Sequence, residues 1–136
     1  MFLKTLKPLV HHVHADSGGL QMITLGKTIT EELKQDVYEN QAKYSDIAMA
    51  FDVIPVKVLG EKSVRLDTKT RLFDAEKHEE CAKESGKNLK TQIEYFLKQK
   101  STTRPFLIAQ GNCYETYMRW VEIMLKQLPK SYIECI

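Results

Sequence analysis

The most unusual local feature of the chain is a histidine-rich stretch near its N-terminus. Three imidazoles and one carboxylate fall within six residues, at His11, His12, His14 and Asp16. Neutral imidazole and carboxylate are both ligands of divalent metal ions. If the stretch is a β-strand, His12 and His14 point to the same face because side chains alternate along a strand. His12, His14 and Asp16 are therefore candidate metal ligands, and a polar strand end with solvated histidines is the alternative.

The pair His12-Val13-His14 resembles the His-hydrophobic-His pair of the HUH group of single-strand nickases. That resemblance implies a divalent metal, a single-stranded nucleic acid as substrate and a helical tyrosine nucleophile, for which Tyr114 and Tyr117 are the candidates. The same stretch is similar to the signature of metallo-β-lactamase-like hydrolases, but Ser17 stands where those enzymes carry a histidine. A metal-dependent nickase or related hydrolase is accordingly one functional hypothesis.

The two tyrosines also have a structural interpretation, in which they are packing residues of a helix. They share one helical stripe with three further apolar residues, Met118, Val121 and Leu125. Trp120 falls away from the centre of that stripe, beside Arg119, where it either completes the core or contributes to a protein interface. One core can hardly absorb all the aromatic and thioether surface of this last segment. The composition favours self-association or a protein partner, with Trp120 and Arg119 in the contact.

A second candidate surface is the segment 63–73, which alternates apolar and charged residues and so predicts a strand with one solvated face. The basic residues on that face are Arg65, Lys69 and Arg71. They are candidate contacts for an acidic protein or for nucleic acid, although alternating charge signs are also typical of a solvated sheet face. No aromatic platform of the kind that binds RNA accompanies them. Protein is therefore favoured over nucleic acid as the partner.

Composition limits the remaining classes. The chain has 136 residues, and its 20 basic and 18 acidic side chains leave a net charge of +2, unlike a dedicated nucleic-acid-binding domain. Its three cysteines, Cys81, Cys113 and Cys135, are widely spaced, which predicts free thiols in a reducing compartment. No apolar run approaches the ~20 residues that cross a bilayer, and the start does not resemble a secretory signal. These features predict one cytoplasmic domain, residues 1–136, without membrane association.

Periodicity and capping predict the elements that position these residues. Helices are expected over 29–43, after the capping box Thr28-Ile-Thr-Glu31, over 74–98, with a weak point at Gly86, and over 112–128. Strands are expected over 46–59, 63–73 and 105–109. Residues 9–15 and 20–25 are interpreted as two strands joined by a turn at Gly18 and Gly19, with a helix over 2–14 as the alternative for the first.

From residue 20 onward the expected order is β-α-β-β-α-β followed by a helix, which is typical of a ferredoxin-like fold. The prediction is an α+β domain: a split βαββαβ antiparallel sheet with its helices on one face, plus an N-terminal strand or helix and a C-terminal helix. A five-stranded α+β sheet and a doubly wound parallel sheet are the alternatives, and the central hairpin disfavours the latter. We expect a non-catalytic protein-binding or assembly module, such as an oligomer subunit, adaptor or inhibitor, without a cofactor. The metal-dependent nickase is the alternative.

Overall fold

A computed structural model describes residues 2–19, 22, 25–56 and 73–136 of the chain. Within these residues the chain forms a parallel sheet of three short strands, β1 (His14–Ala15), β2 (Ile47–Met49) and β3 (Arg104–Phe106). The strands lie in the order β1-β2-β3, with Ala15 opposite Ala48 and Ala48 opposite Pro105. Parallel neighbours require a crossover connection, and each crossover here contains a long helix.

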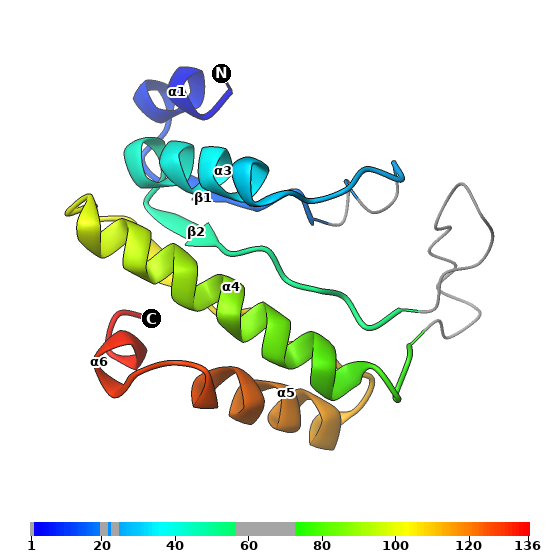
Figure 1. The fold of residues 1–136 in the computed structure, drawn as a ribbon. Helices are drawn as coiled ribbons and strands as arrows, with labels where there is room; N and C mark the ends of the chain where they lie inside the picture. The colour runs from blue at the N-terminus through cyan, green and yellow to red at the C-terminus, as the bar shows by residue number, and fades with distance from the viewer. Residues whose placement is uncertain (1, 20–21, 23–24, 57–72) are drawn as a thin grey trace.

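The two crossover helices are α3 (Glu31–Tyr44), between β1 and β2, and α4 (His78–Lys98), between β2 and β3. A third long helix, α5 (Tyr114–Lys126), follows β3. Short elements stand at the ends: α1 (Phe2–Leu6), the 3-10 turn η1 (Lys7–Leu9) and α6 (Lys130–Ile133). Figure 1 shows α3, α4 and α5 side by side with α4 in the middle, so α5 forms one edge of this row of helices and α3 the other.

Burial alternates along the strands and identifies the face of the sheet that the helices cover. The buried strand residues are Ala15, Ala48 and Pro105, which are small and lie opposite one another. The strand residues of the other face are exposed or half-buried: His14, Ile47, Met49, Arg104 and Phe106. On the covered face the large side chains come from the helices, among them Tyr38 of α3 and Leu89 and Ile93 of α4. The helices thus supply most of the core volume.

The antiparallel ferredoxin-like sheet predicted from the sequence is wrong, because all three strands are parallel. Alternating hydrophobicity identifies a strand but not the direction of its neighbour, and the prediction depended on a central hairpin. Of that hairpin the structure describes residues 46–56 and 73: β2 covers only Ile47–Met49 of the strand predicted over 46–59, and Val56 forms an antiparallel bridge with Phe73. Most of its second strand, including Arg65, Lys69 and Arg71, lies outside the described residues. The mixed α and β composition is confirmed.

The N-terminal prediction is only partly correct. The described residues before Gly18 contain α1, η1 and a strand of two residues, so neither a strand over 9–15 nor a helix over 2–14 matches them. Gly18 has a φ of 76°, the left-handed value expected of glycine in a turn, and its carbonyl accepts from the Met22 N–H at 3.1 Å. The described residues of the predicted second strand do not form one, because Met22 is helical and Leu25 lies in a turn; residues 20, 21, 23 and 24 lie outside the described residues.

The helix predicted over 29–43 is confirmed to within two residues, as α3, but its cap is shifted. Thr30, rather than Thr28, is the N-cap, and its hydroxyl oxygen accepts from the Leu33 N–H at 3.1 Å. This bond satisfies one of the free N–H groups of the first turn.

The C-terminal end of α3 is capped by a segment that comes much later in the chain. The Thr103 hydroxyl lies 2.7 Å from the Ser45 carbonyl oxygen, and the Ser101 hydroxyl donates to the Ala42 carbonyl at 2.7 Å. Both hydroxyl groups belong to the segment that leads into β3. The Ala42 and Ser45 carbonyls at the end of α3 are therefore satisfied by tertiary contacts, whereas the Gln41 carbonyl also accepts from the Ser45 N–H and hydroxyl, which are local.

The helix predicted over 74–98 is confirmed from residue 78 onward, as α4, but the expected break at Gly86 is absent. Packing requires glycine there. A Cβ atom at this position would lie 2.6 Å from Gln127 Cγ and 3.2 Å from Met124 Cα, so Gly86 marks a close approach of the end of α5 to α4.

Candidate functional site

The turn between β3 and α5 is held by side chains from other elements. Trp120 Nε1 donates to the Ile108 carbonyl at 2.9 Å, and His78 Nε2 lies 3.0 Å from the Gln110 carbonyl oxygen. The His78 and Trp120 rings are 5.3 Å apart between centroids. These contacts fix the start of α5 relative to α4.

A half-buried carboxylate lies beside the same turn. Gln110 Nε2 donates to Asp52 Oδ2 at 2.6 Å, at the carboxyl ends of β3 and β2. Burial raises the pKa of the Asp52 carboxyl, and the nearby Asp16 carboxylate acts in the same direction, whereas the bond from Gln110 opposes them. The charged form of Asp52 is therefore less favourable in the folded chain than in water.

The first turn of α5 packs directly over Gly111. A Cβ atom there would lie 2.6 Å from Thr116 Oγ1 and 2.7 Å from Tyr117 N. Thr116 Oγ1 in turn accepts from the Cys113 N–H at 3.1 Å, which closes the N-terminal cap of the helix. The helix predicted over 112–128 thus begins at Tyr114, after a cap centred on Thr116.

The inner face of α5 is a core surface. Trp120, Ile123 and Met124 are buried there, and Trp120 is 0% exposed. The sequence left two interpretations of Trp120 open, and its burial matches the one in which it completes the core. In the folded chain Trp120 has no exposed surface to contribute to a contact, because its indole is already surrounded by protein.

The outer face of α5 carries a second apolar surface. Its members follow helical spacing, and we call them the α5 stripe: Tyr114, Tyr117, Met118, Val121 and Leu125. Tyr114 is 74% exposed, Tyr117 44% and Met118 50%. Val121 and Leu125 are half-buried, and Leu125 also packs against the core. Contiguous exposed apolar side chains of this size are typical of interaction surfaces.

A row of alternating charges borders the α5 stripe on one side. In chain order it consists of Glu115, Arg119, Glu122 and Lys126. Arg119 donates to Glu79 of α4 at 3.1 Å and to Glu122 at 3.2 Å, and Lys126 lies 3.1 Å from Glu122. These partners lower the pKa of Glu122 and raise that of Arg119. The row has no net charge, so Arg119 is part of a neutral charge network.

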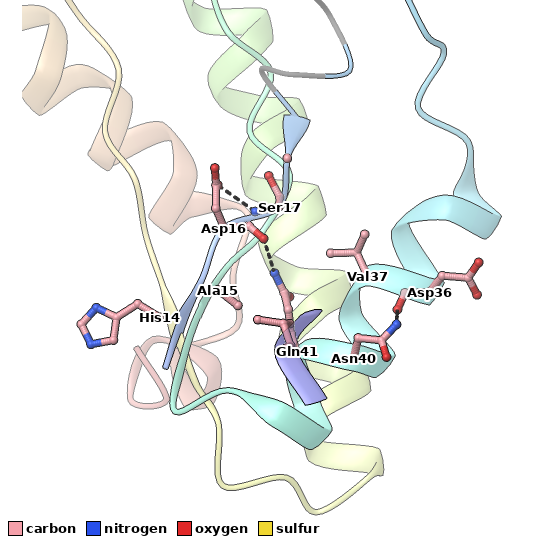
Figure 2. A pocket seen from close by; sticks show the side chains of 10 residues that line it. His14, Ala15, Asp16, Ser17, Asp36, Val37, Asn40 and Gln41 are labelled. Atoms are coloured by element: carbon pink, nitrogen blue, oxygen red, sulfur yellow. Dashed lines mark hydrogen bonds between the residues drawn. The ribbon is translucent and has the colours of Figure 1, made fainter. Parts of the chain in front are cut away.

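A separate cavity of about 640 Å³ lies between β1 and α3, with Leu3 of α1 in its lining. Figure 2 shows Val37, Asp36, Asn40 and Gln41 on the α3 side and His14 directed away from them. The Gln41 amide donates to the Met49 carbonyl at 2.9 Å and accepts from Gln92 at 2.9 Å. The polar groups of the cavity thus serve mainly to join β1, β2 and α3.

The nickase candidates are not brought together. β1, with His14 and Asp16 at its end, is the edge strand farthest from β3, whereas Tyr114 and Tyr117 lie on α5, beyond α4. Asp16 uses one carboxylate oxygen to accept from the Ser17 N–H at 2.7 Å. Among the described residues no three histidine, cysteine or acidic side chains gather where they can hold a metal ion.

None of the described helices has the length and apolarity to cross a membrane.

Sequence reasoning treated the α5 stripe mainly as packing, although its spacing contained a contrary signal. Trp120, Ile123 and Met124 project from a different side of the helix than Tyr114 and Met118, so the apolar residues extend around too much of the helix for one contact with α4. The Asp52–Gln110 pair had no local signal, because its members are 58 residues apart.

A scan against protein-family models, a search of curated proteins and a search of solved structures each found no match to this chain.

Proposed function

We propose that this chain is a non-catalytic protein-binding or assembly module whose docking surface is the α5 stripe. The observation that supports this function is the exposure of Tyr114, Tyr117 and Met118 on a helix whose opposite face is fully packed. Tyrosine and methionine are enriched at protein interfaces. Since the inner face already fixes α5 on α4, the stripe is a preformed surface.

The surroundings of the stripe favour a protein over nucleic acid or an anionic membrane. Both of the latter are recognised by clustered Lys and Arg side chains. The row bordering the stripe alternates in sign, and three of its members, Arg119, Glu122 and Lys126, are already paired within the chain. A neutral polar border around an apolar centre is instead the usual anatomy of a protein interface.

Site-specific cross-linking tests this function. A photoreactive phenylalanine analogue in place of Tyr117 should capture the partner covalently, and the captured protein is then identified and purified. Binding of that partner to the unlabelled chain is measured by calorimetry. We expect the double substitution Y117A/M118A to weaken binding by about tenfold or more, because central apolar contacts contribute most of the affinity.

Leu97→Ala is the matched control. Leu97 is 51% exposed, close to the 50% of Met118, but lies on α4 outside the stripe. It should bind with unchanged affinity. Equal binding by Y117A/M118A and the wild type would contradict the proposed surface.

A further inference from the structure

We infer that the occupant of the α5 stripe is a second copy of this chain, whose α5 packs against it in the antiparallel direction. The inference rests on the proposed function and specifies the partner. It is drawn from the symmetry of two residue patterns on α5 and from the position of this helix at one edge of the row of helices (Figure 1).

The charges provide the first pattern. Along the bordering row the signs are negative, positive, negative and positive, at Glu115, Arg119, Glu122 and Lys126. When a second α5 runs in the opposite direction, Glu115 faces Lys126 of the other copy and Arg119 faces Glu122. Both pairs share one midpoint, between residues 120 and 121. In a parallel pair this row would lie against the other border of the partner's stripe, so neither of these pairs of opposite charges could form.

The apolar residues provide the second pattern. In the antiparallel arrangement Tyr114 faces Leu125 of the other copy and Met118 faces Val121, with a common midpoint between residues 119 and 120. The two midpoints differ by one residue, which is a rise of about 1.5 Å along a helix. Long charged side chains accommodate such an offset, so a single two-fold axis satisfies both patterns. Two-fold symmetry is also the commonest symmetry of soluble homo-oligomers.

The size of the contact sets the expected strength. A helix of this length is roughly 20 Å long and, as a single contact, covers less than the ~800 Å² per partner of a standard interface. We therefore expect a reversible dimer with a Kd of roughly 10–100 μM rather than a permanent one. The surface is consequently exposed in the dilute monomer.

Sedimentation equilibrium on the full chain at concentrations up to several times that range measures the dimer. We expect Y117A/M118A to raise the dimer Kd by about tenfold and E115K or K126E alone to raise it by about threefold. The double exchange E115K/K126E should restore dimerisation, because opposite signs again face each other. Leu97→Ala should dimerise as the wild type, and circular dichroism establishes that each variant is folded.

Thiol cross-linking tests the direction. In a C135S background, a short bismaleimide should join two copies of a K126C variant, because Cys113 of one copy then lies near the substituted position of the other. The C135S protein without K126C should give almost no linked dimer, since two Cys113 thiols lie at opposite ends of an antiparallel pair. Efficient linkage through Cys113 alone would show a parallel pair and overturn the inference.

The failure of this inference is distinct from failure of the proposed function. A chain that stays monomeric at millimolar concentration, yet binds a purified foreign protein through Tyr117 and Met118, rejects self-pairing and supports the docking surface. If the chain stays monomeric and substitution of Tyr117 and Met118 changes no binding, both self-pairing and the docking surface are rejected. If E115K and K126E each weaken the dimer but the double exchange E115K/K126E does not restore it, the antiparallel register is rejected.

Discussion

The two faces of α5 contain similar residue types but have different surroundings. On the inner face Trp120 and Met124 are buried against α4, and the indole N–H has a carbonyl partner. On the outer face Tyr117 and Met118 are exposed among half-buried neighbours. Residue type alone therefore does not distinguish a core surface from a docking surface. Whether a face is core or surface depends on the neighbouring element, and here α4 covers only one side of α5.

The largest difference between the faces should appear when Trp120 is truncated. Trp120→Ala should lower the free energy of unfolding by about 3–5 kcal/mol, because it leaves a cavity and removes the donor to the Ile108 carbonyl. Trp120→Phe keeps most of the volume and should cost about 1–3 kcal/mol through the unpaired carbonyl. Urea unfolding monitored by circular dichroism measures both. A loss below 1 kcal/mol for Trp120→Ala would mean that the inner face is not a core surface.

The next effect concerns the close approach of α4 and α5 at Gly86. Gly86→Ala would stabilise an isolated helix by about 1 kcal/mol, but here we expect a net loss of about 1–3 kcal/mol because the new Cβ collides with Gln127 and Met124. Gln127→Ala in the same chain should recover part of that loss, since it removes the nearest colliding atom, Gln127 Cγ. Chemical denaturation of the two single variants and the double variant tests this. A more stable Gly86→Ala would contradict the packing.

A smaller effect should come from the carboxyl beside the turn that starts α5. The pKa of Asp52 is raised in the folded chain, so the folded state holds its proton more tightly than the unfolded state. This stabilisation is complete below the pKa of the unfolded carboxyl and is lost as pH rises through the folded pKa. Asp52→Asn should flatten the decline in stability above about pH 4. Thermal unfolding across pH 3–8 measures it.

Asp46 is a control for Asp52, because its pKa is shifted in the opposite direction. Its pKa is lowered by the bond from Lys7, at 2.6 Å, and by the bond from the Val13 N–H. Its contribution is therefore present above the unfolded pKa and lost as pH falls through the folded one. Asp46→Asn should lower the free energy of unfolding by a constant amount above about pH 4 and reduce the further loss of stability on acidification. Similar pH profiles for both variants would contradict these assignments.

The smallest effect is expected on the outer face. In dilute solution Tyr117→Ser and Met118→Ser should each change the free energy of unfolding by less than about 0.5 kcal/mol, because exposed side chains away from special contacts contribute little. The same variants should weaken binding by the stripe. A loss of 2 kcal/mol or more would show that another part of the chain covers these residues, and the contrast between the two faces would disappear.

Local signals in the sequence predicted the helices better than the sheet. The caps and periodicity of α3, α4 and α5 lie within each segment, so their existence and approximate bounds could be inferred. The direction of β2 relative to β1 and β3 depends on partners far away in the chain, and a strand of three residues contains little information about it. Gly86 shows the same limit, because its role depends on Gln127.

For the candidate site, the sequence indicated an excess of aromatic and thioether side chains in the last segment but not which of them would be exposed. Trp120 had the composition of an interface residue and is buried, whereas Tyr114, Tyr117 and Met118 were interpreted mainly as packing and are exposed. The difference arises from the rotation of α5 against α4, which tertiary contacts determine. A helical projection limits the choice to two faces and cannot choose between them.

The distant cap of α3 has a consequence for the order of folding. Ser45 and Thr103 are 58 residues apart, and until the segment with Ser101 and Thr103 packs, the Ala42 and Ser45 carbonyls at the end of α3 have water as their partner. Closing so long a loop costs chain entropy, which only the packing of the intervening α4 can offset. The end of α3 should therefore become protected against hydrogen exchange together with the segment leading into β3, late and in one step. Its first turn, which Thr30 caps locally, can form and reopen independently of the rest.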